Sequence, residues 1–164
     1  MEEPPTALRV EVLEEIYRDR YRRFLRVALA VVGDRDTAHE VVQEAFAKAI
    51  RSRFEFRGQG PPEAWVWAIV VNLARSTTRR NTPEAWTTVP EASTTDGYAS
   101  DWPELRTAVA ALPERQRLAV FLRHYADLDY EQIAEVLQIE RGTVAATLHA
   151  AHAVLRKQMS EVPR

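Results

Sequence analysis

Four polar side chains that can read DNA bases lie near the start of a helix that the sequence predicts. Arg141, Thr143, Thr147 and His149 can donate or accept hydrogen bonds at base edges. They belong to the segment Asp129–Lys157, whose apolar spacing predicts two helices joined by a short turn. In a helix-turn-helix, the second helix enters the major groove and places its first side chains on the bases. The segment therefore predicts a DNA-reading motif, with an ordinary helical hairpin as the alternative.

Apolar positions at helical spacing define the two helices of this motif. They are Ile133, Val136 and Leu137 in the first helix, and Val144, Leu148, Ala151 and Leu155 in the second. Only Gln138, Ile139 and Glu140 separate the two sets. A turn of this length is typical of helix-turn-helix geometry.

Composition limits the remaining classes of protein. The chain has 164 residues, 46% of them apolar and none of them cysteine, enough for one core or two small ones. Without cysteine there is neither a disulfide framework nor a thiolate metal site, and a reducing cytoplasm fits. The N-terminus is acidic and proline-bearing, unlike a signal peptide. The longest apolar run, Ala64–Val71, falls well short of the roughly 20 residues that a bilayer requires, so we expect no membrane span.

The charge distribution argues against an autonomous DNA-binding protein. The net charge is −2, and residues 1–100 and residues 101–164 each carry −1. Proteins that bind DNA mainly through its phosphates usually show a basic face, because counterion release supplies most non-specific affinity. We therefore expect that any DNA binding depends on a larger partner that carries the chain to DNA.

Residues 8–80 are predicted to form a domain of three helices. The apolar stripe of the first helix is Leu13, Ile16, Tyr17, Tyr21, Phe24, Ala28 and Val32. Gly33 is predicted to end this helix. A capping box of Thr37 and Glu40 is expected to begin the second helix, with Asp34 and Asp36 as alternative caps. The expected buried face of the second helix is Val42, Ala45, Phe46, Ala49 and Ile50.

The third helix and the segment after it differ sharply in composition. Pro61 and Pro62 favour a helix start, and we expect this helix to reach about Arg80. Residues 81–103 are rich in Thr, Ser, Pro and Asp, which predicts a linker, and residues 104–159 then form the second domain. The linker contains Trp86, Tyr98 and Trp102, which either pack on the two domains or dock on a partner.

Four motifs, taken in order, resemble the extracytoplasmic-function group of bacterial sigma factors. The first is the acidic second helix, through Val42, Gln43, Glu44, Ala45 and Phe46. The second is the tryptophan helix, through Trp65, Ile69, Asn72, Leu73, Ala74, Arg79 and Arg80. The third motif follows the linker and resembles the family's fourth conserved region. It matches through Leu112, Pro113, Arg115, Gln116, Arg117, Tyr130, Ile133 and Ala134. The fourth is the start of the recognition helix, through Gly142, Thr143, Val144, Leu148 and His149.

The resemblance implies an all-α subunit of two small helical domains that binds core RNA polymerase and directs it to promoter DNA. The first domain would contact the minus-ten element and the second the minus-thirty-five element. The expected polymerase-binding residues are Glu40, Gln43, Glu44 and Lys48, whose charges can pair with arginines, although plain solvation would explain them equally. The expected minus-ten residues are Trp67, Asn72, Arg75, Arg79 and Arg80. Trp65 and Ile69 are expected in the core, which leaves Trp67 as the exposed ring.

The departures from the family pattern all remove chemistry that would face DNA. Ala145, Ala146 and Ala150 stand where the recognition helix commonly carries basic or polar groups. Glu140 takes the place of a serine cap, and Gln138 that of a turn glycine. The groups expected to remain for minus-thirty-five readout are Arg141, Thr143, Thr147, His149 and His152. We therefore expect a weakened upstream contact.

Two functions remain open, and a third class has little support. One is a working sigma factor, and the other a sigma-like regulatory protein that binds polymerase or an anti-sigma factor without reading the minus-thirty-five element. An enzyme is not expected. His149 and His152 lie three apart with His124 elsewhere, but there is no HExxH pattern, phosphate loop or nucleophile motif. No catalytic residue, metal site or cofactor is predicted.

Overall fold

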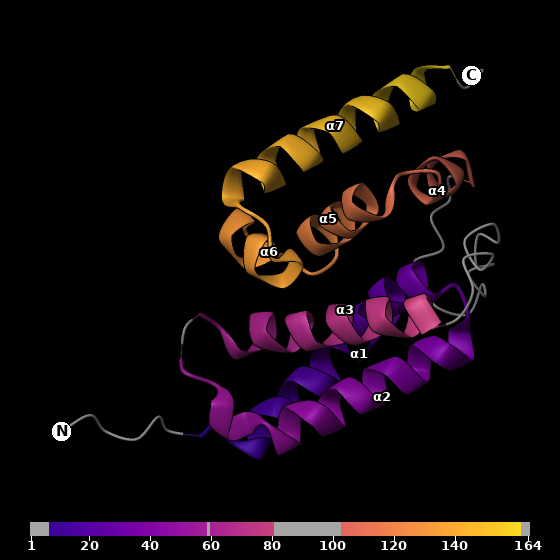
Figure 1. Cartoon of the computed structure of the whole chain (residues 1–164). Helices are drawn as coiled ribbons and strands as arrows, with labels where there is room; N and C mark the ends of the chain where they lie inside the picture. Colours follow the sequence, from indigo (N-terminus) through magenta and orange to yellow (C-terminus); the bar gives the residue numbers. More distant parts are fainter. Residues whose placement is uncertain (1–6, 59, 81–102, 162–164) are drawn as a thin grey trace.

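A computed structural model describes residues 7–58, 60–80 and 103–161 of the chain (Figure 1). These residues form helices and no strand, which confirms the all-α fold. The first half contains α1 (Val10–Val32), α2 (Arg35–Arg51), the short 3-10 turn η1 (Arg53–Glu55) and α3 (Pro62–Arg80). The second half contains α4 (Pro103–Ala110), α5 (Glu114–His124), α6 (Tyr130–Leu137) and α7 (Arg141–Ser160). The predicted linker, with Trp86, Tyr98 and Trp102, lies outside the described residues apart from Pro103, which begins α4.

Aromatic rings fill the centre of the three-helix bundle. Phe24 of α1 is fully buried, and its ring centroid lies 4.0 Å from that of Trp67 on α3. Phe46 of α2 meets Phe24 edge-on, with centroids 5.3 Å apart. Aromatic pairs of this kind contribute about 0.5–1.5 kcal/mol beyond the area that they bury. The predicted stripes of the first two helices thus meet α3 in one core.

Specific caps fix where the first two helices begin and end. Gly33 ends α1 with a φ of 77°, a left-handed conformation that glycine adopts without steric cost. Asp34 then caps α2, since its Oδ2 atom accepts hydrogen bonds from the backbone N–H and the hydroxyl of Thr37. The expected capping box of Thr37 and Glu40 is therefore wrong, because Thr37 serves as a donor to the cap. Ile50 is also not buried as predicted, being 38% exposed near the end of α2.

The turn of the helix-turn-helix lies where it was predicted, and α7 continues to Ser160, beyond the predicted end at Lys157. Residues Gln138 to Glu140 separate α6 from α7, and Gln138 adopts a left-handed conformation with a φ of 54°. At the start of α6, the Asp129 side chain accepts from the backbone N–H of Gln132, whose side chain accepts from the N–H of Asp129. This capping box satisfies two backbone donors that the helix itself leaves unpaired. This capping box was not predicted, although the D-x-x-Q spacing is its signal in the sequence.

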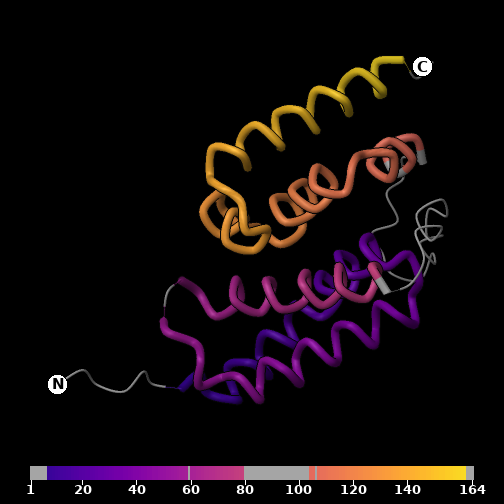
Figure 2. Tube along the Cα trace, in the orientation of Figure 1, coloured from indigo at the N-terminus to yellow at the C-terminus, as the bar shows by residue number. Residues whose placement is uncertain are grey.

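The two halves share a single hydrophobic core. In Figure 2, α3 runs along the side of the first bundle that faces the second half of the chain. α3 packs against α6, and α1 packs against α5. Polar contacts border this interface. Arg23 of α1 lies 3.4 Å from the Asp127 carboxylate, and the guanidinium of Arg26 lies 5.7 Å from the centre of the Tyr125 ring. The halves therefore close on each other in this structure.

Candidate nucleic-acid interface

An exposed stripe on α2 carries the four residues predicted to bind a protein partner. Glu40, Gln43, Glu44 and Lys48 are all exposed and recur at helical spacing along one face. Glu44 Oε1 lies 2.8 Å from Arg51 Nη2, a surface ion pair with both side chains more than half exposed. Such pairs contribute little to stability, so Glu44 can exchange Arg51 for another cation at small cost. The stripe is exposed to solvent, and its binding to a protein partner stays a prediction.

The polar residues near the end of α3 divide into exposed and engaged groups. Asn72 and Arg79 are exposed, whereas Arg75 is partly buried and its Nε atom lies 3.1 Å from Glu114 Oε1. Glu114 opens α5 in the second half of the chain. Arg80 ends the helix, and its side chain lies outside the described residues. Of the expected minus-ten residues, Asn72 and Arg79 are therefore accessible, while Arg75 is paired with the other half of the chain.

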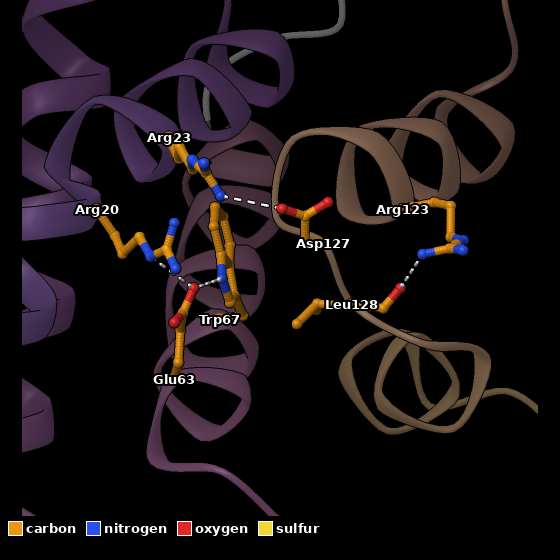
Figure 3. A network of polar contacts seen from close by, with 7 residues as sticks. All are labelled: Arg20, Arg23, Glu63, Trp67, Arg123, Asp127 and Leu128. Carbon is orange, nitrogen blue, oxygen red and sulfur yellow. Dashed lines mark hydrogen bonds and ion pairs between the residues drawn. The ribbon is translucent and has the colours of Figure 1, made fainter.

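Trp67 is not the exposed ring that the sequence predicted. Its side chain is fully buried, whereas Trp65 and Ile69, which were expected in the core, are only partly buried. Figure 3 shows Trp67 between Glu63 on its own helix and the connection from α5 to α6, from which Leu128 points toward the indole. The Glu63 carboxylate accepts from Trp67 Nε1 at 3.5 Å and pairs with Arg20 Nε at 3.5 Å. The error arose because an α3 segment that is apolar on all sides gives no periodic signal for its outer face.

The start of α7 presents a short polar surface beside an open groove. Arg141 and His149 are exposed, and Thr143 and Thr147 are partly buried. The Thr147 hydroxyl donates a hydrogen bond to the backbone carbonyl of Thr143 at 2.6 Å, so this hydroxyl is engaged within the helix. The groove has a volume of about 470 Å³ and is lined by Pro113, Arg115, Gln116, Gly142, Thr143, Ala146, Thr147 and Ala150.

Two groove residues from α5 were not among the predicted DNA-binding residues. Arg115 is exposed, and Gln116 has a buried Oε1 atom without a hydrogen-bond partner among the described residues. They lie next to α7 in space although α6 separates them in sequence. Both residues occur in the segment that resembles the family's fourth region, and this was the available signal. The polar surface of the second half therefore extends from α7 onto the start of α5.

Several exposed side chains along α7 are apolar. Ala145, Ala146 and Ala153 are exposed, and Val154 is 39% exposed. Methyl groups cannot donate hydrogen bonds to phosphates or base edges. Basic side chains flank this surface at Arg141 before it and at the end of α7 after it. α7 thus has the position of the recognition helix in a helix-turn-helix but exposes few groups that can contact DNA.

No helix of the described residues is long and apolar enough to cross a membrane.

Comparisons with known proteins agree with this arrangement. Residues 16–84 match the family described as Sigma-70 region 2, and residues 103–153 match Sigma-70, region 4. The RNA polymerase sigma-H factor of Pseudomonas aeruginosa is 31% identical over 87% of this chain and 83% of its own length. The RNA polymerase sigma factor YlaC of Bacillus subtilis is 26% identical over 91% and 92%.

A solved structure extends the likeness to the whole fold. The sigma factor RpoE of Bartonella quintana, in complex with the anti-sigma factor NepR, superposes with a TM-score of 0.76. The two chains are 20% identical, and the match covers 93% of this chain and 99% of the other. With both sigma regions matched in order, the chain belongs to the sigma-70 family of RNA polymerase sigma factors, within its extracytoplasmic-function group.

Proposed function

We propose that this protein directs core RNA polymerase to promoters, with α2 on the polymerase, α3 on the minus-ten element and the start of α7 on the minus-thirty-five element. The observation that carries the proposal is the match to both sigma regions, in order, over residues 16–84 and 103–153. The protein acts by binding, without catalysing a reaction of its own. Because the proposed partner is core RNA polymerase, we place the protein in the cytoplasm.

The exposed stripe on α2 suits the polymerase contact. Glu40 and Glu44 supply negative charge, Gln43 supplies an amide that donates and accepts, and Lys48 extends the stripe by one turn. Complementary charge fixes the register between two protein surfaces more than it adds affinity. We therefore assign this stripe to a basic surface on core RNA polymerase.

The exposed end of α3 suits single-stranded DNA of the minus-ten element. Asn72 can hydrogen-bond to a base edge, and Arg79 and Arg80 can hold phosphates. Arg75 joins them only when it leaves Glu114. Trp67 contributes to this site only if the second half moves away from α3, because its ring is fully buried in the closed arrangement.

The minus-thirty-five contact rests on fewer groups. Arg141 and His149 are exposed at the start and middle of α7, and Thr143 and Thr147 line the groove beside them. The exposed alanines of α7 support the second candidate, a sigma-like regulatory protein that binds polymerase or an anti-sigma factor without reading this element. The similar solved structures include RpoE in complex with the anti-sigma factor NepR, and CnrH in complex with the cytosolic domain of CnrY. An anti-sigma factor is therefore a candidate partner here too.

Binding to core RNA polymerase, followed by transcription from a library of randomised promoters, tests the first proposal. We expect tight binding and enrichment of a minus-ten sequence. Glu44→Lys should weaken polymerase binding by about tenfold or more, because it places like charges against each other. Glu161→Lys makes the same charge change at the exposed end of α7 and serves as the control. Polymerase binding without any enriched promoter would support the regulatory protein instead.

Restoring basic groups on α7 separates the two candidates. Ala145→Lys and Ala150→Arg add cations to the surface of α7 beside Arg141 and His149. If the surface is a weakened DNA contact, promoter affinity should rise with a steeper salt dependence, while polymerase affinity stays the same. Loss of a bound protein partner, without a gain in promoter affinity, would instead assign the alanine surface to that partner.

A further inference from the structure

Two histidines from different helices of the second half face each other. His124 ends α5, and His152 lies in the middle of α7. Their Nε2 atoms are 3.1 Å apart, and their ring centroids are 5.4 Å apart at an interplanar angle of 57°. In a neutral pair, one Nε2 atom carries a proton and donates it to the lone pair of the other. Neither residue has a role in the proposed polymerase contact.

We propose that His124 and His152 form a two-histidine site for a divalent transition-metal ion of the zinc and nickel class. Imidazole nitrogens bind zinc at about 2.0–2.1 Å. Two nitrogens 3.1 Å apart, each at that distance from one ion, would subtend an angle of roughly 100° at the ion. This angle lies between those of octahedral and tetrahedral coordination. The separation of the two nitrogens therefore suits neighbouring ligands around a single metal ion. The two rings point at each other in the hydrogen-bonded pair, because the distance between their centroids equals the distance between their Nε2 atoms plus about one ring radius on each side. Both side chains must therefore turn to aim their lone pairs at one ion.

Metal binding makes a demand on the protons of the pair. Burial lowers the pKa of His124, and the neighbouring His152 and Arg123 lower it further, whereas Asp127 acts in the opposite direction. The Asp127 carboxylate also pairs with Arg23. A metal ion needs an unprotonated Nε2 atom on both rings, so the ring that donates in the neutral pair must carry its proton on Nδ1 instead.

The donor set defines which ions fit. Imidazole nitrogen suits zinc, nickel and copper, whereas magnesium and calcium require oxygen ligands. Among the residues that the structure describes, no group of three His, Cys, Asp or Glu side chains gathers to hold a metal. His124 is exposed and His152 partly exposed, so water can fill the other coordination positions. We expect affinity well below that of four-ligand structural zinc sites.

A metal at this position would join α5 to α7. These two helices pack against each other within the helix-turn-helix half. An ion that binds the folded protein better than the unfolded chain raises the unfolding temperature with concentration. The proposal depends only on the packing of α5 against α7, and it holds whether or not α7 reads DNA.

Titration of the full-length protein, freed of any histidine tag, with nickel or zinc chloride tests the site. We expect saturable one-to-one binding at neutral pH. His124→Ala and His152→Ala should each weaken it by about tenfold or more, since one imidazole cannot chelate. His149→Ala is the matched control, because His149 is exposed on the same helix three residues from His152 and should leave binding unchanged.

Three results would overturn the site. They are no saturable binding to the unmodified protein, full binding by the His124→Ala variant, and loss of binding by the His149→Ala variant. The last two would assign the metal to a pair of histidines on the surface of α7 alone. His124→Gln and His152→Gln keep the side-chain bulk and replace the alanine variants if those fail to fold. In side-chain NMR spectra, zinc should shift the imidazole signals of His124 and His152 together, leaving His39 and His149 in place.

Discussion

The Nε atom of Arg75 lies 3.1 Å from the Oε1 atom of Glu114, so a residue proposed to hold promoter DNA is paired with a carboxylate from the other half of the chain. A guanidinium that binds a carboxylate in this way cannot give the same N–H group to a phosphate. A phosphate contact through this Nε atom therefore requires that Glu114 be exchanged for DNA. The same side chain serves the closed arrangement and the proposed minus-ten contact in turn.

Glu114→Gln should release Arg75 and raise affinity for single-stranded minus-ten DNA. Both side chains are partly exposed, so we expect the pair to contribute at most about 1 kcal/mol to stability. That energy corresponds to at most about a fivefold change in DNA affinity. Fluorescence anisotropy with labelled DNA measures the effect. Glu161→Gln removes one exposed carboxylate far from Arg75, and an equal gain in that variant would show a general charge effect instead.

Trp67→Ala should be among the most destabilising single substitutions in the protein. The side chain is fully buried against Phe24, and deleting a buried tryptophan costs about 3–5 kcal/mol. Trp65→Ala should cost clearly less, because Trp65 is only partly buried. Urea unfolding monitored by circular dichroism compares the two variants. Similar losses would mean that Trp67 is exposed in the free protein.

Asp129→Ala should destabilise the second half by about 1 kcal/mol through loss of the α6 cap. The substitution leaves the backbone N–H of Gln132 without its acceptor at the helix start. Glu140→Ala provides the control, since Glu140 occupies the corresponding position of α7 but its side chain makes no capping hydrogen bond. Thermal unfolding of both variants measures the difference. A larger loss for the Glu140 variant would contradict this assignment.

Gln138→Gly should stabilise the helix-turn-helix, by up to about 1 kcal/mol. Gln138 has a φ of 54°, and a side chain in this left-handed region costs about 1–2 kcal/mol. The greater freedom of glycine in the unfolded chain offsets about 0.4–1 kcal/mol of the gain. Glu135→Gly, at an exposed position within α6, should instead lose about 1 kcal/mol. Denaturant midpoints that fall in both variants would contradict the role of backbone strain.

Asp34→Asn should remove one acid-sensitive contribution to stability. Hydrogen bonds from Thr37 hold the pKa of Asp34 below its ordinary value of 3.8. Since the folded state prefers the carboxylate, its contribution is complete above 3.8 and is lost as the pH falls through the lowered pKa. Asparagine caps helices without titrating there. The free energy of unfolding should therefore fall less in the variant than in the original protein when the pH is lowered from neutral to about 3.

Helix positions could be predicted from sequence more reliably than the faces that they bury. The extent of α3 and the position of the turn between α6 and α7 follow from prolines and apolar spacing, and the structure confirms them. The outer face of α3 could not be predicted, because Trp65 and Trp67 stand in a segment that is apolar on every side. Their burial depends on partners remote in sequence, since Trp67 packs against Phe24 of α1 and lies beside Leu128, and Trp65 packs against Phe56. Ile50 was wrongly placed in the core for a related reason, since it lies near the end of α2, beyond most of the packing.

The interface between α3 and the second half of the chain also affects how the protein folds during synthesis. A ribosome releases the first three helices before it has synthesised Leu128, so Trp67 lacks part of its cover during that interval. Uncovered apolar surface on a nascent chain attracts chaperones and other unfolded chains. A chain halted before α5 should therefore aggregate more readily than the finished protein. Completion of the second half is thus also what completes the burial of Trp67 in the first half.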